Sequence, residues 1–232
     1  MNGILLNIEG NWAHFKKPET NNNPLTHDFI TKTAFIGMIG AVLGKERGEM
    51  AKLFPQLSDD LLYGVCIRSA VRKESWAFTL RYAVNLFEKR PKQMEFLKNP
   101  RYRVAAVVKN ERSAALLNEF AAMVEASESC FTPVLGLHNC PANLEFEARG
   151  LFQKRSGDFT TMAFITDAHN LTNVLNTKDF RVGVERVPSF QNEDFWNPPE
   201  RYIKVIYPSE SREISAQGDF YEFTDKSTWT LI

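Results

Sequence analysis

Apolar residues recur along this chain with two different periods, and each period predicts one kind of element. A helical period occurs twice, in residues 31–44 and 111–125. The apolar faces of these two expected helices carry Phe35, Ile39, Val42 and Leu43 in the first, and Ala114, Leu117, Ala121 and Val124 in the second. A period of two, typical of a long strand or a hairpin arm, runs from Trp76 to Leu86.

Shorter apolar runs predict strands around these helices. We expect strands at residues 4–9, 61–71, 101–108 and 131–137, with a linker at 54–60. The order strand, helix, strand, insertion, strand, helix, strand is the split βαβ or ferredoxin-like pattern, which includes the RNA-recognition fold. The predicted fold class is therefore α+β, with a ferredoxin-like domain in residues 1–142 and an inserted β-hairpin in about 74–100. A β-rich part in 143–232 has candidate strands at 144–148, 160–166, 179–186, 202–207 and 220–223, and a polar loop at 188–201.

The first expected helix has two unusual features. Its start places Lys32 and Thr33 at the positive end of the helix dipole, where phosphate binds well, although a solvated polar cap is the common alternative. Its interior contains Gly37 and Gly40, and each interior glycine costs about 1 kcal/mol relative to alanine. These glycines indicate either tight packing on a sheet or the close approach of a ligand.

Composition narrows the class of protein. The chain has 232 residues, is 44% hydrophobic, and carries 28 basic and 28 acidic residues, so its formal net charge is zero. Bulk charge therefore does not indicate a nucleic-acid-binding protein, and a basic site must come from local segregation. The three cysteines show no CxxC spacing, and no apolar stretch approaches 18 residues. We expect a cytoplasmic protein without disulfides, signal peptide, membrane span, metal or cofactor.

Basic residues gather in segments that also carry aromatic side chains. Such clusters predict an interface for single-stranded nucleic acid, in which rings stack on bases and cations meet phosphates, although each cluster alone is also typical of a solvated face. For Trp12 and Phe15, burial in the core is an equally good interpretation. The candidate RNA-binding residues are Trp12, His14, Phe15, Lys16, Lys17, Lys32, Thr33, Arg68, Arg72, Lys73, Arg81, Lys89, Arg90, Lys92 and Arg101.

Catalytic signatures are scarce in this sequence. It contains no HExxH, GxSxG, Walker or GxGxxG motif, and its four histidines are scattered. A metal-independent ribonuclease that uses His14 with Lys16 or Tyr102 as general base and acid stays open, because spacing does not show whether these groups meet.

Five segments carry a likeness to a known family, namely residues 12–15 (WAHF), 24–29 (PLTHDF), 32–41 (KTAFIGMIGA), 99–104 (NPRYRV) and 133–142 (PVLGLHNCPA). In combination they resemble the fifth CRISPR-associated (Cas) family, in its type I-B-like form, over most of residues 1–150. The last segment adds His138 and Asn139 to the RNA-binding candidates. The resemblance implies the repeat-associated (RAMP) fold: a ferredoxin-like domain, an inserted thumb and a C-terminal β part.

The resemblance also implies a function in antiviral defence. It implies a subunit of the Cascade surveillance complex, a ribonucleoprotein, that caps the 5′ handle of the guide RNA (crRNA). Its partners would be the helical backbone subunit, the large subunit that recognises the PAM, and target DNA near the PAM. In the thumb, we expect a turn at residues 89–92 whose cations meet RNA phosphate, and we expect Met94, Phe96 and Leu97 to wedge or pack against a neighbouring subunit.

One branch of the family, in type I-C systems, also cuts the precursor RNA with an active site that includes an adjacent Lys-His pair. Here Lys109 is followed by Asn110, and the chain contains no Lys-His dipeptide. We therefore expect a non-catalytic RNA-binding subunit. The alternatives are an endoribonuclease of the same fold that processes the precursor, and a small-molecule enzyme on a ferredoxin-like scaffold.

Overall fold

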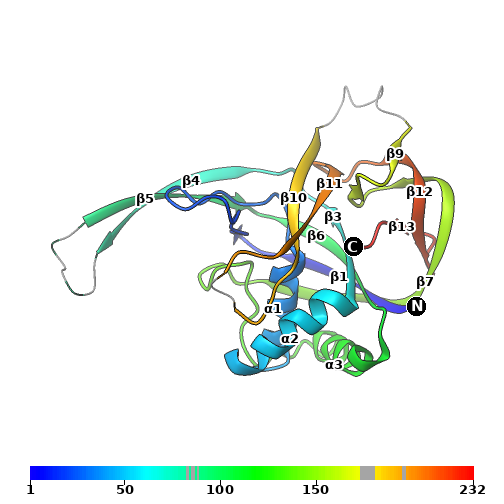
Figure 1. Cartoon of the computed structure of the whole chain (residues 1–232), viewed down its shortest axis with the longest axis horizontal. Helices are drawn as coiled ribbons and strands as arrows, with labels where there is room; N and C mark the ends of the chain where they lie inside the picture. The colour runs from blue at the N-terminus through cyan, green and yellow to red at the C-terminus, as the bar shows by residue number, and fades with distance from the viewer. Residues whose placement is uncertain (82–83, 85–86, 88, 173–180, 195–196) are drawn as a thin grey trace.

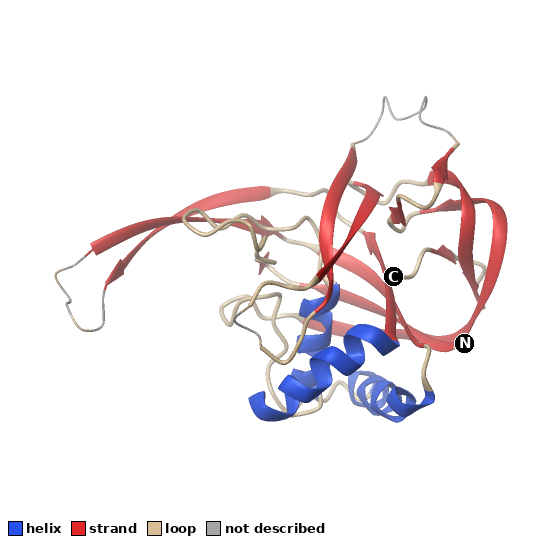
Figure 2. Ribbon diagram, viewed as in Figure 1, coloured by secondary structure: helices blue, strands red, loops and turns tan. Residues whose placement is uncertain are grey.

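The computed structural model describes residues 1–81, 84, 87, 89–172, 181–194 and 197–232. A long hairpin projects from the rest of the molecule (Figure 1). The three α-helices lie together beside the largest sheet (Figure 2). Most C-terminal strands lie at the side of the molecule opposite the hairpin (Figure 2).

Four antiparallel strands form the ferredoxin-like part of the largest sheet. β1 (Asn2–Glu9) lies between β7 (Asn143–Thr161) and β6 (Arg101–Val108), and β6 also pairs with β3 (Leu61–Ile67). The spatial order β7-β1-β6-β3 confirms the predicted ferredoxin-like α+β fold. Residues 104–107 of β6 are fully buried and join two hydrophobic cores alternately, because successive side chains of a strand point to opposite faces.

Both helices that the periodicity predicts are present. α1 (Lys32–Val42) begins after Thr31, whose hydroxyl accepts a hydrogen bond from Ala34 N at 3.3 Å and so caps the helix. α3 (Ala114–Glu125) follows a short 3₁₀ turn, η1 (Glu111–Ser113). Phe35 of α1 and Phe120 of α3 are fully buried and lie edge to face, so the two helices share one core.

The expectation of a linker at residues 54–60 is wrong. These residues form the second half of α2 (Arg47–Asp60), which packs against α1 through Met50 and Leu57. Pro55 lies inside α2 and breaks the sequence signal, since an interior proline usually ends a helix. A capping box formed by Glu46 and Glu49 stabilises the start of the helix. The packing of α2 on α1 offsets the destabilising effect of the interior proline.

The expectation of a strand at residues 131–137 is also wrong. This segment is a loop, closed by an isolated bridge between Val134 and Pro141, and the fourth strand of the ferredoxin-like sheet is β7. Gly136 has a φ of +90°, and a Cβ there would lie 2.0 Å from the carbonyl oxygen of His14. The chain therefore turns at a position that only glycine accommodates.

The C-terminal residues form further strands. β7 pairs with β1 through residues 143–151 and with β12 (Ile214–Phe223) through residues 152–161, so one strand links both expected parts of the chain. The division at residue 143 stays a prediction. β9 (Asn170–Leu171) and β13 (Thr228–Trp229) each pair with β12. A second sheet contains β10 (Val182–Phe190), β11 (Arg201–Pro208) and β8 (Ile165–Thr166).

The projecting hairpin consists of β4 (Lys73–Arg81) and β5 (Lys89–Lys98), and the short β2 (Trp12–Ala13) pairs with its base. The expected turn at residues 89–92 is wrong, because Lys89 pairs with Arg81 and Pro91 with Thr79. The connection lies in residues 82–88, most of which are outside the described residues, as is the end of the expected strand 76–86. Pro91 fits in β5 because that part of the strand has a partner on one side only.

Candidate nucleic-acid interface

A basic cavity of about 530 Å³ opens where the hairpin joins the ferredoxin-like sheet. Four cations line it: Arg68 after β3, Arg72 before β4, Lys98 at the end of β5 and Arg101 at the start of β6. Glu9 is the only carboxylate among its described lining residues. The cavity therefore carries a net positive charge, which suits a phosphate backbone.

Two of these cations are already paired within the protein. Arg101 Nε lies 3.3 Å from Glu9 Oε2, and Lys98 Nζ lies 2.7 Å from Glu74 Oε1. The guanidinium groups of Arg68 and Arg72 are exposed and have no hydrogen bond or ion pair with the part of the chain that the structure describes. Arg68 and Arg72 are therefore the cations best placed to meet an external anion. Three of the four cations are predicted from the sequence, and Lys98 is not.

Short turns hold the cavity together. Asn99 has a φ of +48°, a left-handed conformation that asparagine tolerates better than most residues, and its N–H donates to the Asn11 carbonyl at 2.8 Å. Ser69 Oγ donates to the Asn99 carbonyl at 3.2 Å and accepts from Arg101 N at 3.1 Å. These bonds fix the positions from which the arginines extend.

The two aromatic residues of the first loop pack against other rings of the protein. Trp12 packs on Trp76 with ring centroids 4.5 Å apart and on Phe96 at 6.4 Å, forming an aromatic cluster at the base of the hairpin. Phe15 is 3% exposed and packs against Tyr102. Phe15 therefore occupies the core position that the sequence had left open and is not available for base stacking, whereas Trp12 is half-buried and packs against the edge of the core.

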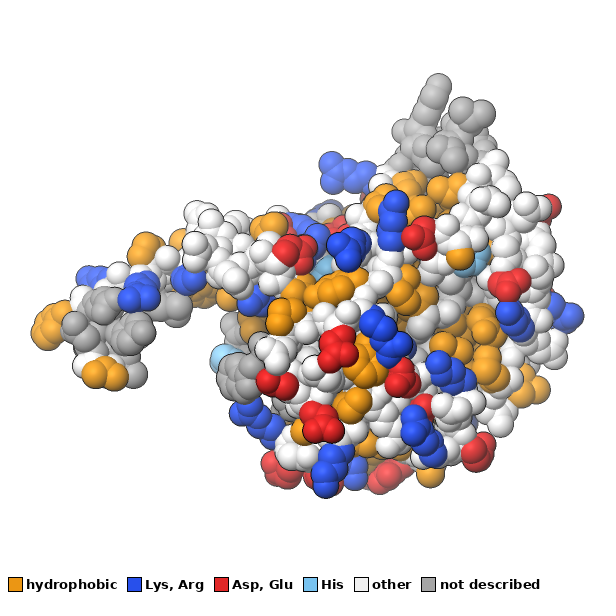
Figure 3. Space-filling view, viewed as in Figure 1, with side chains coloured by type: hydrophobic (Ala, Val, Ile, Leu, Met, Phe, Trp, Pro, Cys, Tyr) orange, Lys and Arg blue, Asp and Glu red, His pale blue; other side chains and the backbone are white. Residues whose placement is uncertain are grey.

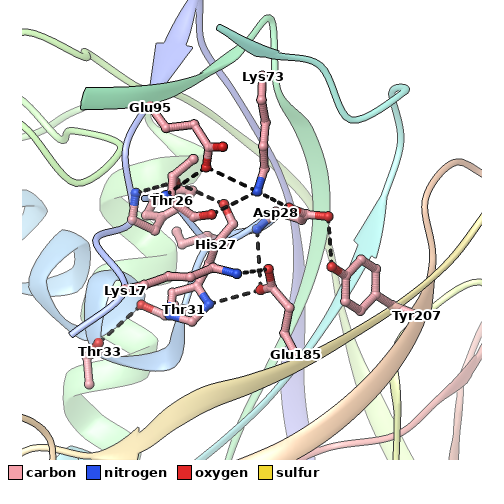
Figure 4. Close-up of polar contacts among 12 residues, drawn as sticks. Lys17, Thr26, His27, Asp28, Thr31, Thr33, Lys73, Glu95, Glu185 and Tyr207 are labelled. Atoms are coloured by element: carbon pink, nitrogen blue, oxygen red, sulfur yellow. Dashed lines mark hydrogen bonds and ion pairs between the residues drawn. The ribbon is translucent and has the colours of Figure 1, made fainter. Parts of the chain in front are cut away.

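Two of the candidate lysines belong to a network of buried and half-buried carboxylates (Figure 4). Lys17 Nζ lies 2.8 Å from Glu185 Oε1, and Lys73 Nζ lies 2.7 Å from Asp28 Oδ1 and 3.3 Å from Glu95 Oε2. The network connects the segment before α1 with β5 and β10. The sequence does not predict these carboxylates as partners of the lysines, because they come from three distant segments and no local pattern groups them.

Lys32 lies elsewhere than the helix-end hypothesis implies. Its side chain is 4% exposed, and its ammonium donates to the Ser58 carbonyl at 2.8 Å. Burial, with a further contribution from Lys109, lowers the pKa of Lys32 to about 8. The ammonium thus meets the C-terminal end of α2 rather than the surface. Thr33 is half-buried, and its hydroxyl is 3.1 Å from that of Thr31.

The cations of the hairpin are mostly on its surface. Arg81, Lys89 and Arg90 are exposed, and Lys92 is half-buried and donates to the Asn21 carbonyl at 3.3 Å. In the register of β4 and β5 these residues follow the aromatic cluster toward the end of the hairpin, which projects from the body (Figure 1).

Two of the three residues expected to wedge against a neighbouring subunit are buried, and the third, Met94, is half-buried. Phe96 and Leu97 are 1% and 2% exposed and belong to the core, so they are not available to a neighbouring subunit. Hydrophobic side chains are visible instead at the far end of the hairpin (Figure 3), where Val84 and Phe87 are 94% and 95% exposed.

The remaining candidates are exposed loop residues. His138 and Asn139 lie in the loop closed by the bridge between Val134 and Pro141, and Lys16 follows β2. Pro141, at the end of this loop, lines the basic cavity, but His138 and Asn139 are not among its described lining residues.

The described residues show little catalytic geometry. They contain no group of three or more His, Cys, Asp or Glu side chains that could hold a metal ion, and all three cysteines are free thiols. Burial raises the pKa of Tyr102 well above its ordinary value, and its hydroxyl donates to the Asp28 carbonyl at 3.2 Å. The pairing of His14 with Tyr102 as base and acid therefore gains no support. No described helix is both long and apolar enough to span a bilayer.

Solved structures show which class of protein has this fold. A CRISPR protein from Archaeoglobus fulgidus matches with a TM-score of 0.64 at 15% identity, over 99% of this chain and 98% of that chain. A chain of a CRISPR RNA-guided surveillance complex matches at 0.53 and 15% identity, over 89% of each. A chain of a Type III-B Cmr-beta complex matches at 0.51 and 9% identity, over 92% of this chain and 86% of that chain. This chain therefore shares its fold with these CRISPR proteins.

The family follows from the sequence itself. The family model described as CRISPR-associated protein (Cas_Cas5) matches residues 3–157, which is more than half of the chain. The protein therefore belongs to the Cas5 family. No curated protein sequence matches it.

Proposed function

We propose that this chain is a non-catalytic subunit of a type I Cascade complex and binds the 5′ handle of the guide RNA. Membership of the Cas5 family supports a role in a CRISPR effector complex. The similarity in fold to a chain of an RNA-guided surveillance complex agrees with this role. The type I-B-like subtype rests on the sequence resemblance and is part of the proposal.

The basic cavity is the observation that carries the proposal. It combines four cations with one carboxylate, and two of its arginines have no partner among the described residues. A guanidinium group suits phosphate because it presents several N–H donors in a fixed plane. The cavity is open and polar rather than deep and apolar, which fits a nucleic-acid backbone better than a small-molecule substrate.

The hairpin supplies the contacts with the rest of the complex in this proposal. Its surface cations Arg81, Lys89 and Arg90 would follow the guide RNA beyond the handle, and its exposed end would reach the backbone subunit. The large subunit and target DNA near the PAM would lie beside the body of the protein. We place the complex in the cytoplasm.

We propose a non-catalytic subunit because of the residue at position 110. Asn110 stands where the cleaving branch has histidine, and its side-chain amide donates to Asp60 Oδ1. Asp60 is completely buried and also accepts from Arg112 and Ser113. Asn110 therefore stabilises the start of α3 and provides no imidazole for proton transfer.

The test compares two RNAs of equal length. One is a guide RNA with its 5′ handle, and the other has the handle replaced by a scrambled sequence. Fluorescence anisotropy at fixed salt should give an affinity for the handle RNA at least about tenfold higher, which corresponds to about 1.4 kcal/mol. Equal affinity for both RNAs contradicts the proposal, because it leaves only non-specific charge attraction.

A further inference from the structure

A second and larger hollow, of about 940 Å³, lies beside the N-terminal half of α1. Three other segments border it, residues 14–24, 134–137 and 188–199. Its described lining residues are apolar, amide and hydroxyl side chains with one lysine and one histidine, and none is a carboxylate. We call this hollow the α1 groove. Its volume is within the range of ligand sites, and its charge balance suits an anionic ligand.

The α1 groove is continuous with the basic cavity along the chain. Residues 10 and 11 line the cavity, and residues 14–16 line the groove. In the same way, residues 141–143 line the cavity and residues 134–137 line the groove. Two segments of the chain thus border both hollows at nearby residues, although no residue lines both.

His14 brings a fixed hydrogen-bond acceptor to the α1 groove. Its side chain is 3% exposed, and Nδ1 donates to the Glu95 carbonyl at 2.7 Å, so the proton of the neutral ring is on Nδ1. Burial lowers the pKa of His14, against the opposing effect of Glu95, and this favours the neutral ring. Nε2 is left with a lone pair and no partner among the described residues. Unlike His27 Nε2, it is not sealed from solvent.

Gly37 leaves the helix backbone bare on the same groove. A Cβ at Gly37 would have a single neighbour, Phe54 Cζ at 4.0 Å, whereas a Cβ at Gly40 would lie 2.2 Å from Met50 Sδ. Gly40 is therefore explained by helix packing, and Gly37 is not. A glycine that the packing does not require gives a flat surface against which a planar ring can lie.

We propose that the α1 groove holds one nucleotide of a bound single-stranded RNA and selects a base that carries an exocyclic amino group. The amino group donates to His14 Nε2, the ring lies on the Gly37 face of α1, and Lys16 meets the neighbouring phosphate. Adenine, cytosine and guanine have such an amino group, whereas the base of purine riboside has neither an amino group nor a ring N–H. A buried acceptor rejects a base that brings no donor to it, because the acceptor is then left unpaired. This inference rests on the proposed function, since it requires that RNA binds.

The probes are two RNA octamers that differ only in the amino group, one of adenosine and one of purine riboside. The wild-type protein should bind the adenosine octamer about tenfold more tightly at fixed salt. His14→Phe keeps a ring in the site but removes the acceptor, so it should bind both octamers equally. Gly37→Leu fills the groove from a helix position with open space and should weaken adenosine octamer binding about tenfold. Gly48→Leu is the control, because Gly48 lies in α2, has no atom within 4 Å of its Cβ position and does not line the groove.

The outcomes separate this inference from the proposed function. If neither octamer nor handle RNA binds with salt-dependent affinity, the proposed function fails. If both octamers bind equally to the wild type, the inference is wrong and the proposed function stands. If Gly37→Leu binds RNA like the wild type but no longer joins its partner subunits, the groove holds a protein segment and the inference is overturned. Thermal unfolding of each variant checks that the fold is intact.

Discussion

Glu185 in β10 accepts a hydrogen bond from His27 Nδ1 at 2.9 Å, although 158 residues separate the two along the chain. Lys17 adds an ion pair to the other oxygen of the same carboxylate at 2.8 Å. Burial would raise the pKa of Glu185, but the hydrogen bonds from His27 and Lys17 outweigh it, so the pKa lies below its ordinary value. This contact anchors the C-terminal sheet to the segment that precedes α1.

We expect Glu185→Gln to lower the free energy of unfolding by about 2 kcal/mol at pH 7, because it leaves the buried donors with a weaker partner. A carboxyl group with a depressed pKa stabilises the fold above its unfolded-state pKa and loses this effect as the pH falls through its folded-state pKa. The difference between wild type and variant should therefore shrink in acid. The free energies of unfolding in urea at pH 7 and pH 4 measure this difference. Glu213→Gln, at an exposed glutamate, is the control and should change neither value by more than a few tenths of a kcal/mol.

Lys32 also makes the stability of the fold depend on pH, here because a positive charge is buried. Its pKa is about 8 in the folded protein and near 10.5 in the unfolded chain, so the unfolded chain binds more protons between these values. The stability of the wild type should therefore rise with pH in this range, by about 2 kcal/mol between pH 7.5 and 9.5 relative to Lys32→Met. The control is Lys52→Met at an exposed lysine of α2, which should show no such change. Parallel stability curves for wild type and Lys32→Met contradict the buried position of the ammonium.

The hairpin can be shortened without removing its base. Residues 79–91 replaced by Asn-Gly would join Phe78 to Lys92, which are paired across the hairpin, through a favoured two-residue turn. The aromatic residues at the base of the hairpin remain packed, so we expect a folded protein with nearly unchanged thermal stability. It should no longer join the guide-bound complex. Normal assembly of the shortened protein, measured by co-purification with the backbone subunit, shows that the hairpin is not the thumb of our proposal.

We expect no cleavage of a repeat-containing RNA by the purified protein, with or without EDTA. The reason is that Asn110 replaces the histidine of the cleaving branch and is bonded to Asp60. Denaturing electrophoresis after a long incubation should show intact RNA. A discrete product with a 5′ handle, lost in His14→Ala, would instead establish the endoribonuclease alternative.

The sequence predicts the ferredoxin-like framework because its information is local. The apolar face of α1 and the continuous apolar run of β6 each require only neighbouring residues. The sequence fails at α2, since Pro55 interrupts a helix whose stability comes from packing against α1. It fails again at residues 131–137, where a strand is expected and the chain forms a loop. The turn at Gly136 in this loop depends on the close approach of the His14 carbonyl.

The candidate site is predicted less completely, for the same reason. The arginines of the basic cavity stand out because they flank strand ends, and strand order brings those ends together. The burial of Lys32 depends on where the C-terminal end of α2 lies, and no sequence pattern places α2 correctly. The partners of Lys17 and Lys73 come from positions 28, 95 and 185, so only the folded chain shows that these lysines are already paired.

The most direct test of the account measures how the affinity for handle RNA depends on salt when both unpaired arginines of the basic cavity are removed. Each phosphate contact with a single strand contributes about 0.7 to the slope of log affinity against log salt concentration. We expect Arg68→Ala with Arg72→Ala to lower the slope by about 1.4 and the affinity at least about tenfold. Lys154→Ala with Arg155→Ala removes the same charge from an exposed part of β7 and should leave both nearly unchanged. Equal effects of the two double variants would contradict handle binding in the basic cavity.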